Sequence, residues 1–87
     1  MSQWESKEPC LVSGAVPCEY HHLYTRKAHP ELQFKAWNSM PLHRAAHTEF
    51  HVRGAKYMAN KYPRIRRWLE KNDWTFDEHL DRWTHRY

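Results

Sequence analysis

Apolar residues in the first half of the chain fall in two short runs that a polar connection separates. The stretch 17–25 is rich in Tyr and His and predicts a strand. A connection over 26–35 follows, contains Pro30 and is predicted to be irregular or briefly helical. The return strand and its packing face are marked by Phe34, Trp37, Met40 and Leu42.

From about Arg44 the apolar spacing becomes helical, and the pattern allows two ends for this helix. The apolar residues set among polar neighbours are Ala45, Ala46, Phe50 and Val52. Gly54 either ends the helix as a left-handed cap or lies inside a helix that continues through Tyr57 and Met58.

A second helix is predicted after Pro63, a residue favoured at the first helical position. Ile65, Trp68 and Leu69 recur at i, i+3 and i+4, which places them on one face. Residues 72–73, Asn followed by Asp, end this helix.

A third helix is predicted from Thr75 onward. Thr75 with Glu78 three residues later has the form of a capping box. Phe76, Leu80 and Trp83 then follow at i, i+4 and i+7, the spacing of a helical face.

Length and composition are typical of one small folded domain. Eighty-seven residues lie near the lower limit for a chain that folds on its own core, but aromatic residues make up 15% and supply large buried areas. The net charge of +4 is compatible with a nucleic-acid partner without establishing one. No run approaches the roughly eighteen apolar residues of a membrane span, and the polar start lacks a signal-peptide core. We therefore expect a cytoplasmic protein.

Histidine is the unusual residue type, with eight copies in the chain. His47 and His51 are four residues apart, so on a helix their rings lie on one face and can share a ligand. His21 and His22 are adjacent, so on a strand they point to opposite faces. A strand with His-His and a helix with His-x-x-x-His together predict a hydrolytic site with one metal ion.

The order His21-His22, Asn38, His47, His51 resembles the HNH nucleases, the ββα-metal class. The stretch 19–22, Glu-Tyr-His-His, is similar to the Glu-x-His-His element of the nuclease colicins. The segment 37–42 before the helix with His47 is similar to small bacterial and phage HNH proteins, and the resemblance covers about residues 9 to 55.

The resemblance implies an α+β fold in a single domain, 1–87. A polar lead-in over 1–9 would precede a ββα-metal core over 10–55, which consists of a two-stranded antiparallel hairpin and the motif helix. Two or three C-terminal helices over 56–87 would follow.

The resemblance also implies residue roles. His22 would be the general base, since a neutral imidazole is a competent base near pH 7. His21, His47 and His51 would hold one divalent ion. Three imidazoles suit zinc or nickel, whereas family members are said to work with magnesium or manganese, so the metal stays open among these four.

Two further residues have roles that come from the family alone. Asn38 would hold the loop and orient the base. Glu19 would support the site from outside the ligand set. The colicin-type Glu pairs with an Arg that has no upstream match here, and Arg44 or Arg53 would have to replace it.

The expected substrate is DNA, which the chain would nick or cut as a hydrolase. Arg26, Lys27 and Lys35 would contact the DNA backbone, because the loop that carries them lies beside the scissile phosphate in this family. The basic residues of the second predicted helix are expected to be a solvated face. A phage packaging or recombination protein is a further expected partner, and a phage-encoded chain would act in the host cytoplasm.

The alternative function is a non-catalytic ββα-metal adaptor that binds DNA or protein in a phage or bacterial DNA-processing complex. The complete set of histidines favours the enzyme, because an adaptor has no need of His22.

The stretch 10–14, Cys-Leu-Val-Ser-Gly, resembles one half of a zinc knuckle in which Ser13 replaces the second cysteine. The other half would fall at His43 and Ala46. Cys10 and His43 fill two of the four positions that a structural zinc needs, and Cys18 is a candidate to replace one of the missing ligands. Packing in the core is the favoured alternative for both cysteines. We therefore expect Cys10 and Cys18 to be reduced thiols packed in the core.

Overall fold

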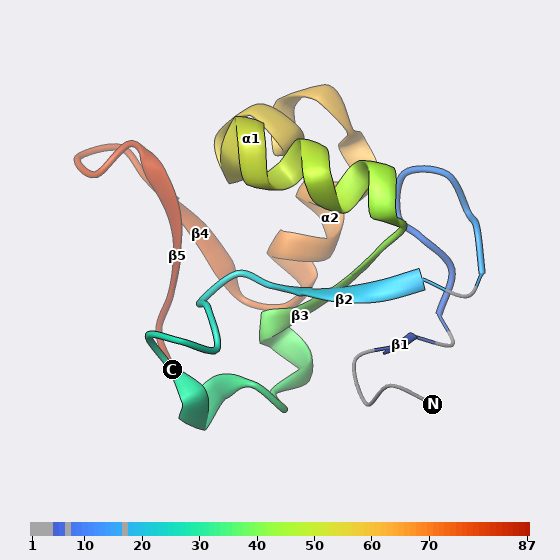
Figure 1. The fold of residues 1–87 in the computed structure, drawn as a ribbon. Helices are drawn as coiled ribbons and strands as arrows, with labels where there is room; N and C mark the ends of the chain where they lie inside the picture. Colours follow the sequence, from blue (N-terminus) through green and yellow to red (C-terminus); the bar gives the residue numbers. More distant parts are fainter. Residues whose placement is uncertain (1–4, 7, 17) are drawn as a thin grey trace. The chain divides into compact units, whose positions relative to one another are not determined.

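The computed structural model describes residues 5–6, 8–16 and 18–87, with only the backbone of 5 and 6. Residues 1–4 and 7 of the predicted lead-in, and Pro17 at the start of the predicted first strand, lie outside the described residues. The strands are β1 (Glu5–Ser6), β2 (Cys18–His22), β3 (Ser39–Leu42), β4 (Trp74–Asp77) and β5 (Arg82–His85). The helices are α1 (Arg44–Lys61) and α2 (Pro63–Lys71) (Figure 1). The predicted α+β class is confirmed.

The chain divides into two compact units, Met1–His47 and Thr48–Tyr87, and the boundary falls inside α1. In the first unit the strands form an antiparallel sheet in the order β1-β2-β3. His21 pairs with Met40, and Tyr20 pairs with Pro41. Proline fits β3 because β3 is an edge strand of this sheet. Both predicted strands are present, but β2 ends at His22 rather than at residue 25. Of the four residues predicted for the return strand and its packing face, only Met40 and Leu42 lie in β3, whereas Phe34 is exposed in the preceding connection and Trp37 lies in a 3₁₀ helix.

The connection between β2 and β3 is a long loop that contains two short 3₁₀ helices, η1 (Pro30–Leu32) and η2 (Ala36–Asn38) (Figure 1). Leu32, only 4% exposed, packs the loop into the core of the first unit. The other buried apolar residues of this core are Cys10, Cys18, Met40, Leu42 and Ala46. Both cysteines are buried and neither forms a disulfide, which confirms that they are packed thiols.

Helix α1 combines features of the two predicted endings. Gly54 has φ 84° and ψ 167°, which is not helical, yet the chain resumes helical conformation immediately after it. This conformation is open almost only to glycine. The glycine therefore separates a first part of α1, with Phe50 buried, from a second part with Met58 and Ala59 buried.

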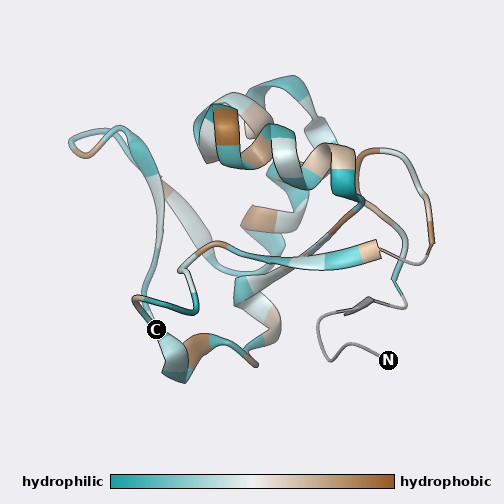
Figure 2. Ribbon diagram, in the orientation of Figure 1, coloured by the Kyte–Doolittle hydropathy of each residue, from teal (hydrophilic) through white to brown (hydrophobic). Residues whose placement is uncertain are grey.

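The second predicted helix is confirmed as α2. It begins at Pro63, and Ile65 and Leu69 are fully buried. In Figure 2 the ribbon of α2 is largely hydrophilic in colour, with an apolar stretch in brown. The helix ends before Asp73, which has a positive φ of 66°.

The third predicted helix is wrong, because residues 74–85 form the antiparallel hairpin β4–β5. One helix, α2, follows α1, and the hairpin takes the place of the next. The capping box does not form. Instead the Asp77 carboxylate accepts hydrogen bonds from the backbone N–H groups of His79 and Leu80, which closes a turn. Phe76 pairs with Trp83 across the strands, with ring centroids 5.9 Å apart. Aromatic cross-strand pairs favour a hairpin over a helix.

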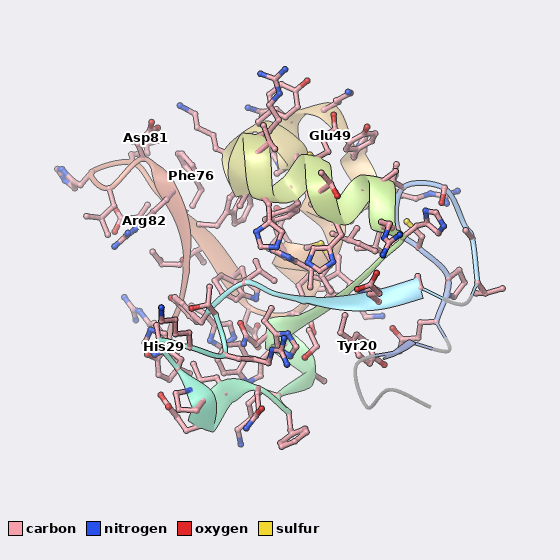
Figure 3. The ribbon with its side chains drawn as sticks, in the orientation of Figure 1. Tyr20, His29, Glu49, Phe76, Asp81 and Arg82 are labelled. Carbon is pink, nitrogen blue, oxygen red and sulfur yellow. The ribbon has the colours of Figure 1, made fainter. Side chains whose placement is uncertain are left out.

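The tip of this hairpin carries charged residues. Figure 3 shows Asp81 and Arg82 there, beyond Phe76. Asp81 has φ 55° and accepts a hydrogen bond of 2.8 Å from Lys56. Among the helices of the described residues, none combines the length and apolar character that crossing a membrane requires.

Candidate metal centre

Three histidines from β2 and the first part of α1 converge. The ring centroids of His21 and His47 are 4.9 Å apart, with the rings nearly perpendicular. His51 lies one turn beyond His47 in the same helix, before the break at Gly54. One nitrogen from each of the three rings lies within 4.8 Å of the others. These three residues could bind a metal ion, and they are the three predicted ligands.

The donor set fits a metal ion. In a tetrahedral site with metal–nitrogen distances near 2.0–2.1 Å, ligand nitrogens stand about 3.3 Å apart, so small side-chain rotations close the remaining gap. Three neutral imidazoles suit zinc and other transition ions. Burial differs among the three, since His21 is buried, His47 is half-buried and His51 is exposed. Solvent therefore reaches the centre from the His51 side.

Glu19 lies on the same face of β2 as His21, two residues earlier, because side chains alternate along a strand. Its Oε2 atom is 3.9 Å from Nδ1 of His47. This distance is too long for a hydrogen bond, and the contact is an ion pair only when the ring of His47 is protonated. A carboxylate next to Nδ1 favours the tautomer with the hydrogen on Nδ1. The lone pair of Nε2 is then available to bind a metal ion. Glu19 thus lies beside His47, one of the three histidines that could bind a metal ion.

His22 is the last residue of β2 and points to the face opposite His21. Its Nε2 atom lies 2.8 Å from the backbone carbonyl oxygen of Gln33. A carbonyl oxygen only accepts, so Nε2 donates, and the lone pair of the neutral ring is on Nδ1. Burial lowers the pKa of His22, as does the charge of Arg26, while the Gln33 carbonyl opposes them. The lowered pKa favours the neutral ring.

Asn38 is fully buried and ties the loop together at both ends. Its Oδ1 atom accepts from the backbone N–H of Tyr24 at 2.7 Å. Its Nδ2 atom donates to the backbone oxygens of Tyr24 at 3.0 Å and Leu32 at 3.2 Å. Leu32 immediately precedes Gln33, so Asn38 and His22 hold adjacent residues of the same loop.

The three basic residues predicted to contact DNA are all exposed on this loop: Arg26, Lys27 and Lys35. Arg26 is near enough to His22 for its charge to affect the pKa of that ring. The loop thus presents positive charge beside His22.

Gln33 is a site residue that the sequence did not indicate. It acts through its backbone carbonyl, so its side chain carried no signal.

The segment 10–14, which resembles half of a zinc knuckle, forms a loop around the sulfur of Cys10. Burial raises the pKa of Cys10, but hydrogen bonds from the His43 backbone, Ser13 and the Val12 backbone outweigh it and lower the pKa overall. These donors hold the loop around the sulfur of Cys10.

Searches against protein-family models, curated protein sequences and solved structures return no match to this chain.

Proposed function

We propose that this chain is a metal-dependent endonuclease of the HNH, ββα-metal type, which hydrolyses phosphodiester bonds of DNA. In this proposal β2, β3 and the first part of α1 are the ββα core. The observation that carries the proposal is the convergence of His21, His47 and His51 next to His22, a fourth histidine held by a hydrogen bond. A centre that only stores or senses a metal has no need of His22.

Phosphodiester hydrolysis requires a water that loses its proton while it attacks phosphorus in line with the leaving oxygen. A divalent ion held by the three imidazoles would stabilise the negative charge that develops on the phosphate and the departing 3′ oxygen. The exposed side of the cluster at His51 is the side from which a phosphate can approach.

His22 is the general base. The Nδ1 lone pair takes the proton of the attacking water, and the resulting imidazolium keeps its Nε2 hydrogen bond to the carbonyl of Gln33. That carbonyl dipole stabilises the positive ring and fixes its orientation. His21, His47 and His51 would hold the ion on one side of a phosphodiester that lies across the end of β2, and His22 would act from the other side.

Asn38 and Glu19 are positioning residues. The hydrogen bonds of Asn38 to Tyr24 and Leu32 hold the loop that presents the Gln33 carbonyl. Glu19 orients the ring of His47. Neither residue exchanges a proton with the substrate.

The loop cations bind the DNA backbone. Arg26, Lys27 and Lys35 are exposed, and contacts from such residues to phosphate oxygens position the duplex without reading its sequence. Affinity from these contacts falls steeply as salt increases.

The test is cleavage of supercoiled plasmid in separate reactions with magnesium, manganese, nickel or zinc. We expect open-circular or linear product with at least one metal, none in a chelator, and none from His22→Ala. A matched control is His79→Ala, which removes an exposed histidine of the β4–β5 turn.

A wild-type protein that binds the metal and DNA but leaves the plasmid intact with every metal would overturn the proposal. That result would instead support the non-catalytic adaptor.

A further inference from the structure

Helix α1 is interrupted three residues after His51. Gly54 has φ 84° and ψ 167°, and a residue in this conformation turns the chain out of the helical path. His51 therefore lies in the last turn of the first part of α1. The last turn of a helix leaves its final carbonyl groups without intrahelical donors and unwinds more readily than the turns before it. One of the three histidines of the candidate metal centre is thus carried by a helix end.

Hydrogen bonds cross this break from one part of α1 to the other. The Glu49 carboxylate, in the first part, accepts a bond of 2.9 Å from Nζ of Lys61 and one of 2.7 Å from the hydroxyl of Tyr62. Lys61 is the last residue of the second part, and Tyr62 follows it. We refer to Glu49, Lys61 and Tyr62 as the clasp.

Aromatic contacts reinforce the clasp. The ammonium of Lys61 lies 5.2 Å from the ring centroid of Tyr62 and 5.6 Å from that of Tyr57, which favours this position of the charge. The guanidinium of Arg53, in the first part of α1, also lies over the Tyr57 ring at 5.3 Å. The side chain of Glu49 is only 26% exposed, so solvent weakens its bonds less than those of a fully exposed pair. The clasp therefore holds the two parts of α1 together around Gly54.

Glu49, labelled in Figure 3, lies two residues from His47 and two residues from His51. Side chains two apart on a helix do not face each other, so the carboxylate lies on the side of α1 away from the two rings. Glu49 thus supports the turn that carries His51 from behind, and it acts on the centre through the helix rather than through contact with an ion.

We infer that Glu49 is a positioning residue of the metal centre. Through Lys61 and Tyr62 it holds the end of the first part of α1, and so keeps the ring of His51 where it can share an ion with the other two histidines. When only a fraction of the molecules has the binding-competent conformation, the apparent affinity falls by that fraction. This inference rests on the metal centre of the proposed function and does not require cleavage.

The experiment measures zinc and nickel binding to the full chain by isothermal calorimetry, at a temperature at which circular dichroism shows every variant to be folded. Glu49→Ala should weaken binding by roughly 5- to 30-fold, the factor that corresponds to one or two lost hydrogen bonds. Tyr62→Phe removes one donor and keeps the ring, so it should weaken binding less. The double variant should bind about as weakly as Glu49→Ala, because both changes remove the same hydrogen bond.

Two controls separate positioning from a general loss of stability. Ile65→Val destabilises the buried side of α2 without a change in the clasp. Lys56→Ala removes a 2.8 Å contact to Asp81 of the hairpin, which does not cross the break. Both should bind the metal as the wild type does. Wild-type affinity in Glu49→Ala, or equal weakening by Ile65→Val, would overturn the inference.

Hydrogen exchange of the metal-free chain gives a readout that needs no ion. Glu49→Ala should speed exchange of the backbone amides of residues 50–53, the last turn before Gly54, more than exchange of the amides of α2. Ile65→Val should show the opposite order. Unchanged exchange at 50–53 in Glu49→Ala would mean that the clasp does not hold this turn.

Plasmid cleavage separates this inference from the proposed function. A wild type that binds metal and cleaves nothing, combined with weak metal binding by Glu49→Ala, refutes the endonuclease and supports the positioning role. A wild type that cleaves, combined with unchanged metal affinity in Glu49→Ala, refutes the positioning role and leaves the endonuclease standing. A wild type that binds neither zinc nor nickel refutes the positioning role as well.

Discussion

Nε2 of His22 donates a 2.8 Å hydrogen bond to the backbone carbonyl of Gln33, eleven residues further along the chain. This bond joins the end of β2 to the loop that carries the exposed cations. It also determines which nitrogen of His22 keeps its lone pair, because the carbonyl takes the hydrogen of the other. The proposed base is thus oriented by backbone from a segment distant in sequence.

Replacement of His22 by alanine should abolish cleavage while metal binding survives. His22 points to the opposite face of β2 from His21, so the three converging rings remain in place. Plasmid cleavage, isothermal calorimetry with zinc or nickel, and far-UV circular dichroism measure the three properties. If metal affinity falls together with activity, His22 is a ligand and its assigned role is wrong.

His47→Ala and His51→Ala should each lose the metal together with activity. A metal that binds only the folded chain stabilises it by about 2.7 kcal/mol at a hundredfold excess over its dissociation constant. The wild type should therefore melt at a higher temperature with metal than in a chelator, and both variants should lose most of this difference. The control His79→Ala should keep it. An identical melting temperature with and without metal in the wild type speaks against the site.

Asn38→Ala should destabilise the first unit, because the part-buried backbone groups of Tyr24 and the buried carbonyl of Leu32 lose their hydrogen bonds. A lost partner of this kind costs about 1–3 kcal/mol. Urea unfolding monitored by tryptophan fluorescence measures the change. Asn60→Ala, at an exposed position of α1, is the matched control and should be nearly neutral. A similar effect of both substitutions would mean that Asn38 does not anchor the loop.

Arg26→Ala combined with Lys27→Ala should weaken binding to unrelated DNA duplexes by a similar factor. Each lost phosphate contact should reduce the slope of log affinity against log salt by roughly 0.9. The comparison is Arg66→Ala with Arg67→Ala on α2, where Arg66 lies 3.8 Å from Glu70. We expect the α2 pair to change the slope less. The reverse order would place the DNA on α2.

Acid should remove a stabilising contribution from Glu49 on α1 (Figure 3). Hydrogen bonds from Lys61 at 2.9 Å and Tyr62 at 2.7 Å lower the pKa of Glu49. A lowered pKa in the folded state means that the contribution is present above the unfolded pKa and is lost as pH falls through the folded pKa. Glu49→Gln should therefore be less stable than the wild type at pH 7.

The pH series supplies the check on Glu49. Urea unfolding from pH 7 to pH 3 should show the difference between the wild type and Glu49→Gln shrinking below pH 4.5, the ordinary value for this group. Glu70→Gln, whose partner Arg66 is 3.8 Å away at an exposed i,i+4 position, should show a much smaller dependence. A difference that stays constant across this range would contradict the assignment.

Local patterns in the sequence determined several elements correctly. Pro63, Ile65 and Leu69 predict α2, and the strands on either side of the loop follow from their apolar and aromatic residues. The position of His47 and His51 on the same face of α1 also follows from spacing alone, because four residues make about one helical turn. Information of this kind lies within a few residues of the element that it describes.

At two places the sequence is compatible with two structures. Residues 74–85 allow a helix or the hairpin β4–β5, and Gly54 allows the helix to end or to continue. Thr75 and Glu78 have the form of a helix cap, but the turn at Asp77 and the cross-strand pair Phe76–Trp83 stabilise two strands instead. The spacing i, i+4, i+7 does not separate these outcomes, since only the contacts between the two strands distinguish them.

The meeting of His21 with His47, and of His22 with the Gln33 carbonyl, was decided only by the tertiary structure. The antiparallel register of β2 with β3 sets which histidine faces the start of α1, and a shift of one residue would exchange the two faces. The sequence by itself determined which groups are available and how they repeat along each element. Their convergence requires pairing between segments far apart in the chain, and the physical reason is that such pairing depends on the packing of the whole unit rather than on any local spacing.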